Sequence, residues 1–71
     1  MARDALTRLS VNMNPETTEA LRDLSEGQGV SYTETVRRAI ALLTFAEQIR
    51  AAGGKLITQD RRGDFREVIL L

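Results

Sequence analysis

The 71-residue chain contains neither cysteine nor histidine. Disulfides are therefore excluded, and we expect no zinc finger or other histidine-based metal site. The same absences remove the commonest base and a common nucleophile of enzymes. The sequence also has no glycine-rich phosphate loop, and it has no motif that would pair carboxylates with a pocket. We therefore expect a protein that is not an enzyme and uses no cofactor.

Aromatic residues and long apolar runs are also scarce. One tyrosine and two phenylalanines do not form a stacking platform for single-stranded nucleic acid. No run of about 18 apolar residues and no charged–apolar–small leader occurs. The sequence therefore predicts a soluble, intracellular (cytoplasmic) protein with no membrane partner.

Net charge is missing as well, since ten basic residues balance ten acidic ones. A strongly basic domain is the usual mark of a protein that attracts nucleic acid in bulk. Any binding to DNA must then come from a few well-placed groups, and we expect non-specific affinity to be modest.

The chain has the length of one small domain and an ordinary apolar fraction of 42%. A core of this size is marginal without disulfides or a metal, which leaves oligomerisation as the route to stability. We expect an obligate homodimer. Residues 1–5 are predicted to be a flexible arm.

Polar and apolar residues alternate over residues 8–13, which predicts a β-strand that runs roughly from Leu6 to Met13. Leu9, Val11 and Met13 share one face. Nothing else in the chain is available to pair with this strand before two helices begin. The simplest partner is the same strand of a second chain, and a two-stranded ribbon fits the major groove of B-DNA.

The first helix is predicted from its end signals. Asn14 is typical of an N-cap and Pro15 of the first helical position. Leu21 and Leu24 form a narrow apolar stripe. Gly29 is suited to a left-handed C-terminal residue, so this helix should end there.

A second helix should begin at the capping box Ser31–Glu34 and run to about Ala52, where Gly53 and Gly54 end it. Its apolar band is too broad for one partner surface. We expect its own first helix on one side and a second chain on the other. The band comprises Val36, Ala39, Ile40, Leu42, Leu43, Phe45, Ala46 and Ile49.

Residues 53–71 form an extension. Two strand-like stretches, near Leu56–Thr58 and Phe65–Leu70, with a glycine-containing turn between them predict a β-hairpin there. The turn is either a type I turn with a bulge or a two-residue turn at Arg62-Gly63. The two turns would pair the strands in registers that differ by one residue, so the sequence does not decide which side chains face inward.

The order of strand, short helix, glycine turn and longer helix resembles the ribbon-helix-helix family of DNA-binding proteins (the MetJ, Arc and CopG type). The resemblance covers about residues 6–50 and rests on Arg-Leu-Ser-Val-Asn-Met, on Asn-Pro-Glu, and on Gly-Val-Ser before the second helix. It implies a mostly α fold with a short N-terminal strand. The strands of an intertwined homodimer would form an antiparallel ribbon, and residues 6–52 would bind DNA and dimerise.

The resemblance also implies that Arg8, Ser10 and Asn12 read bases and that Ser31 and Thr33 anchor a phosphate. Arginine bonds guanine, and asparagine adenine, through two hydrogen bonds each. A helix N-terminus favours a phosphate oxygen through its free N–H groups. The plainer alternatives are a solvated strand face and an ordinary helix cap.

Three arginines are weaker candidates for phosphate contacts. Arg37 and Arg38 form a basic pair one turn into the second helix, and solvent or Glu34 is the plainer partner. Arg3 lies in the predicted arm.

These observations predict a transcriptional regulator, most simply a repressor, that binds double-stranded DNA as a homodimer, with neighbouring dimers on adjacent half-sites. One alternative is an antitoxin whose residues 55–71 bind a toxin protein. Another is an accessory protein of plasmid partition or DNA transfer. A protein-interaction dimer that does not bind DNA is the third. The hairpin either joins dimers or covers one end of the core.

Overall fold

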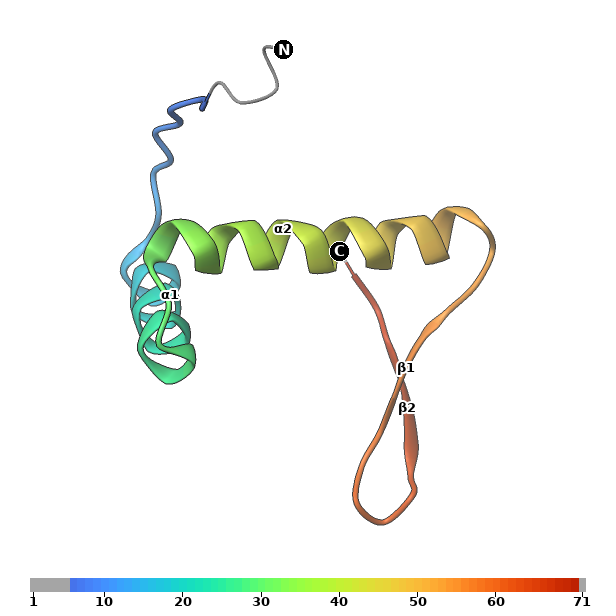
Figure 1. Cartoon of the computed structure of the whole chain (residues 1–71). Coiled ribbons are helices and arrows are strands. Elements are labelled where there is room, and N and C mark those ends of the chain that lie inside the picture. The colour runs from blue at the N-terminus through green and yellow to red at the C-terminus, as the bar shows by residue number, and fades with distance from the viewer. Residues whose placement is uncertain (1–5, 71) are drawn as a thin grey trace.

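The computed structural model describes residues 6–70 and is mostly helical (Figure 1). Two helices come first, followed by a two-stranded antiparallel sheet. This confirms the two predicted helices and the C-terminal hairpin. Neither helix is long and apolar enough to cross a membrane. The elements are α1 (Pro15–Gln28), α2 (Tyr32–Ala51), β1 (Leu56–Gln59) and β2 (Phe65–Val68).

Helix α1 begins and ends as its sequence signals predict. The side chain of Asn14 accepts a 2.8 Å hydrogen bond from the N–H of Thr17, and a proline opens the helix. At the other end Gly29 has a φ of 65°, in the left-handed region. Its N–H and that of Val30 donate to the carbonyls of Glu26 and Ser25. These two bonds form a Schellman motif, which satisfies carbonyls that the helix leaves free.

Helix α2 follows after a three-residue connection. Ser31 caps it by accepting a 3.0 Å hydrogen bond from the N–H of Glu34. The other half of the predicted capping box does not form, because the Glu34 carboxylate binds Arg37 and Arg38 instead. Bonds to a guanidinium are stronger than a bond to a neutral N–H, which explains the preference. The helix ends at Ala51, close to the predicted Ala52.

The hairpin uses the first of the two predicted turns. The N–H of Gly63 donates to the carbonyl of Asp60, and the N–H of Asp60 donates to the carbonyl of Asp64. Gly63 has a φ of 87°, whereas no non-glycine residue within 6–70 has a positive φ. A type I turn with a glycine bulge has this pattern, and a type I′ turn at Arg62-Gly63 does not.

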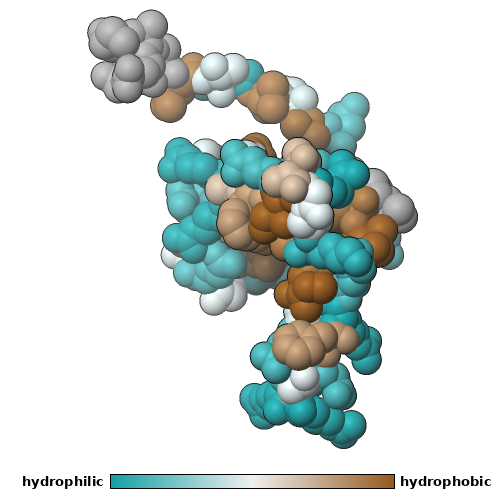
Figure 2. All heavy atoms as spheres, turned by 90° about the vertical axis from the view of Figure 1, so that its right-hand side faces the viewer, coloured by the Kyte–Doolittle hydropathy of each residue, from teal (hydrophilic) through white to brown (hydrophobic). Residues whose placement is uncertain are grey.

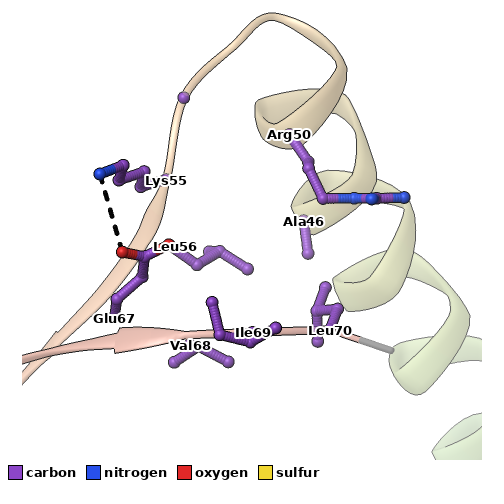
Figure 3. A pocket seen from close by; sticks show the side chains of 9 residues that line it. Ala46, Arg50, Lys55, Leu56, Glu67, Val68, Ile69 and Leu70 are labelled. Atoms are coloured by element: carbon purple, nitrogen blue, oxygen red, sulfur yellow. Dashed lines mark ion pairs between the residues drawn. The ribbon is translucent and has the colours of Figure 1, made fainter.

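The turn sets the register of the two strands. Leu56 lies opposite Val68 and Gln59 opposite Phe65. Leu56, Val68, Ile69 and Leu70 line a hollow against Ala46 of α2 (Figure 3). The hairpin therefore covers the C-terminal part of α2, which was the plainer of the two roles predicted for it.

The predicted N-terminal β-strand is not a strand in the single chain. Residues 6–14 carry no helix or strand, and all of them are exposed. A strand is defined by its hydrogen bonds to a second strand, and within residues 6–70 β1 and β2 pair only with each other. The intermolecular ribbon therefore stays a prediction. The predicted arm, residues 1–5, lies outside the described residues.

The hydrophobic core of one chain is small. Ala46 is the only buried apolar residue among those described, and Ser25 and Thr35 are the buried polar ones. The radius of gyration is 15.6 Å, against about 11 Å expected for a compact chain of this length. The accessible surface is 6869 Å², against about 4,400 Å² for a compact protein of this mass. A single copy thus leaves much of its apolar surface uncovered.

Candidate nucleic-acid interface

The N-terminal segment, residues 6–14, runs beside an apolar hollow at the start of α2. Leu9, Val11 and Met13 line this hollow together with Val36. Exposure falls along the segment, from 80% at Leu9 to 40% at Met13, as the chain approaches α1. The three residues predicted to share the apolar face therefore do lie on one surface.

The predicted base-reading residues lie along the same segment. Ser10 and Asn12 do not line the hollow, in keeping with the alternation, whereas Arg8 does line it, against the alternation. All three are exposed. No ion pair within residues 6–70 involves Arg8. Its guanidinium carries five N–H donors, and none of them is bonded to an acceptor within residues 6–70.

The predicted phosphate anchors lie at the N-terminus of α2. Thr33 lines the same hollow as Arg8. Ser31 is occupied as a cap, through its bond from the N–H of Glu34. Within residues 6–70 no hydrogen bond is found for the N–H groups of Tyr32 and Thr33. An anion at this end of the helix would meet two free donors and the positive end of the dipole.

The two arginines of α2 are engaged with acceptors of their own chain. Arg37 lies 2.7 Å from one carboxylate oxygen of Glu34, and Arg38 lies 3.1 Å from the other. Arg38 also donates a 2.7 Å hydrogen bond to Gln28, which ties α2 to the end of α1. The partnership predicted between Glu34 and Arg38 is confirmed. Arg3 lies outside the described residues.

Three further arginines lie in the hairpin, where the sequence analysis considered them only as turn and strand residues. Arg61, Arg62 and Arg66 form no ion pair within residues 6–70. The carboxylate of Asp60 is nearby but accepts from the backbone N–H groups of Arg62 and Asp64. The adjacent pair Arg61-Arg62 at the turn was the sequence feature that could have marked these residues as candidate binding groups.

A second apolar surface is the groove between α1 and α2. It is lined almost wholly by carbon, and its large side chains are half exposed, including Leu24 at 51% and Ile40 at 59%. Hydrophobic surface of this kind lies in the middle of the molecule in Figure 2, between the N-terminal segment and the hairpin. We call the groove between α1 and α2 the interhelical groove. Its walls are Met13, Thr17, Ala20, Leu21, Leu24, Thr35, Val36, Ala39, Ile40 and Leu43.

Residues 6–70 contain no cluster of three or more acidic side chains that would hold a metal ion. No family model, curated protein or solved structure matches this chain. The resemblance to the ribbon-helix-helix family therefore stays a prediction that rests on the residues.

Proposed function

We propose that this chain is a homodimeric, sequence-specific DNA-binding regulator of the ribbon-helix-helix type, acting as a transcriptional repressor. The observation that carries the proposal is the N-terminal segment. It has the alternation of a strand and has no strand partner within residues 6–70 of its own chain. A second copy would supply that partner and leave Arg8, Ser10 and Asn12 on the outer face of a ribbon.

The interhelical groove supports the homodimer in this proposal. A monomer whose largest apolar side chains are half exposed leaves most of the hydrophobic stabilisation unused. A second copy of this chain would cover the groove on both chains at once, since each contact of a two-fold interface forms twice.

The N-terminus of α2 supports the proposed docking on DNA. Phosphate contacts from Tyr32 and Thr33 N–H groups would set the height of the ribbon in the groove, while base contacts would carry the sequence information. Because few cations are free, we expect a weak salt dependence compared with a basic DNA-binding domain.

The decisive experiment selects bound sites from random double-stranded DNA with the wild-type chain and with Arg8→Ala and Asn12→Ala. The wild type should enrich one motif. Each variant should lose about 1–3 kcal/mol of discrimination at one base position. Both variants should stay folded, because these side chains are exposed. Equal, motif-free binding by all three proteins would refute recognition by the ribbon.

A matched control uses the proposed phosphate site. Thr33→Pro removes one N–H donor at the second position of α2, where proline fits the helix geometry. This variant should weaken binding to all sequences alike and leave the motif unchanged. If no fragment is retained by the wild type even at low salt, the protein-interaction dimer replaces our proposal.

The folded hairpin favours the regulator over the antitoxin. Toxin-binding tails are typically disordered alone, whereas this segment has its own turn and packs against α2. Limited proteolysis of the free protein tests the choice. Rapid loss of residues 55–71 would favour the antitoxin.

A further inference from the structure

The hairpin carries two kinds of surface that its own chain does not use. One strand face packs toward α2, but Ile57 and Phe65 on the other face are 51% and 69% exposed. The tip adds Arg61 and Arg62, which form no ion pair within residues 6–70. The tip is hydrophilic in Figure 2. The same turn also holds Asp64 and Asp60, whose carboxylate accepts from backbone N–H groups of the turn. The hairpin thus presents apolar side chains beside two arginines.

Helix α1 carries the complementary surface. Between Pro15 and Gln28 it has four acidic residues and one arginine. Glu16 and Asp23 each lie one helical turn from Ala20, which lines the interhelical groove, and Asp23 directly precedes Leu24, another of its walls. All four residues are exposed. Along this side of α1 an apolar wall is therefore edged by carboxylates, and neither Glu16 nor Asp23 has an ion-pair partner within residues 6–70.

The placement of the two surfaces along α2 connects them. Helix α1 and the hairpin project from the same side of α2, α1 near its N-terminal end and the hairpin near its C-terminal end (Figure 1). When two α2 helices lie antiparallel about a two-fold axis that runs along this projection, each α1 stands beside the hairpin of the other copy. Such a contact forms twice and closes the dimer.

We infer that the hairpin of each chain docks on α1 of a second copy of this chain, with Arg61 and Arg62 facing Asp23 and Glu16. The exposed strand face would cover the apolar wall that Leu24 and Ala20 provide. This inference rests on the proposed function, from which it takes the two-fold dimer. It gives the extension beyond residue 52 a role in holding the dimer together.

The test measures the dimer dissociation constant of the full chain by sedimentation equilibrium, without DNA. Arg61→Glu combined with Arg62→Glu should weaken the dimer about fivefold to tenfold at low salt, since exposed ion pairs are individually weak. The loss should shrink at about 0.5 M salt, where such charges are screened. Both positions have negative φ, so glutamate fits the turn.

Charge exchange makes the test specific. Asp23→Lys alone should weaken the dimer about threefold, and its combination with the two arginine changes should bind more tightly than the arginine variant does. Glu26→Lys is the matched control, because Glu26 lies on α1 away from the groove walls. It should leave the dissociation constant unchanged.

Three outcomes would overturn the inference. One is that the two sets of changes weaken the dimer independently, with no recovery in the combination. Another is that the arginine changes affect only assembly above the dimer, which would mean that the hairpin joins dimers. The third is an unchanged dimer that still binds its DNA motif, which would leave the proposed function intact. A chain that is monomeric throughout would instead refute the dimer on which the proposed function depends.

Discussion

At the scale of single residues, the buried polar groups hold the two helices at their junction. The hydroxyl of Ser25 donates to the carbonyl of Val30 across the end of α1. The hydroxyl of Thr35 donates to the carbonyl of Ser31. Both residues are buried, and no buried side-chain polar atom within residues 6–70 lacks a partner. The turn between α1 and α2 is therefore stabilised by side chains as well as by the backbone.

Replacing Ser25 with alanine should lower the free energy of unfolding by about 1–2 kcal/mol, because the carbonyl of Val30 loses its partner in a half-buried place. Thr18→Ala is the control. Its hydroxyl makes the same kind of bond, to the carbonyl of Asn14, but at an exposed position. Urea denaturation should show less than about 0.5 kcal/mol for the control. Equal losses would contradict a special role for burial.

Two glycines two residues apart should respond to alanine with opposite signs. Gly29 has a positive φ, and a Cβ there meets no atom within 4 Å, so Gly29→Ala should cost about 1–2 kcal/mol of backbone strain alone. Gly27 is helical, with equally open space, so Gly27→Ala should stabilise by about 0.5–1 kcal/mol. Thermal unfolding of both variants measures the difference. A destabilised Gly27→Ala protein would mean that this surface contacts something in the assembled state.

At the scale of elements, α2 organises the molecule because the other elements use different parts of its surface. Helix α1 packs near its start and the hairpin covers Ala46 near its end. Arg37, Ala41 and Gln48 share the opposite, exposed side. The broad apolar band of α2 is thus only partly covered within one chain.

A charge at Ala46 should detach the hairpin from α2. Ala46 is 4% exposed, and Ala46→Glu forces a larger, charged side chain between α2 and the hairpin, against Leu56 and Val68. We expect the amides of β1 and β2 to exchange hydrogen faster while the amides of α1 stay protected. Ala41→Glu, on the exposed side of the same helix, is the control. Uniform loss of protection throughout the chain would show that the hairpin and the helices unfold as one unit.

At the scale of the whole molecule, the interhelical groove and the N-terminal segment both have surfaces that a second copy of the chain would cover. The radius of gyration is well above that of a compact chain because three parts of the chain project outward. Each of these parts carries apolar side chains. These parts are the N-terminal segment, α1 and the hairpin (Figure 1). In the proposed dimer their apolar sides meet across the two-fold axis.

Ile40→Lys should convert the dimer to a monomer, since Ile40 lines the interhelical groove at 59% exposure. A lysine in a covered groove would lose its hydration without gaining a partner. Light scattering after gel filtration measures the mass. Ala41→Lys, the neighbouring exposed residue, should remain dimeric. An Ile40→Lys protein that still dimerises would place the interface elsewhere.

The ends of both helices, the hairpin and the shared apolar face of the N-terminal segment could be predicted from the residues alone. Asn14, Gly29, Ser31 and Gly63 act on backbone groups a few residues away, so local patterns reveal their effects. Which of the two predicted turns forms, and the packing of the hairpin on Ala46, are seen only in the tertiary structure. The packing joins residues far apart in the chain, and local patterns do not specify such contacts.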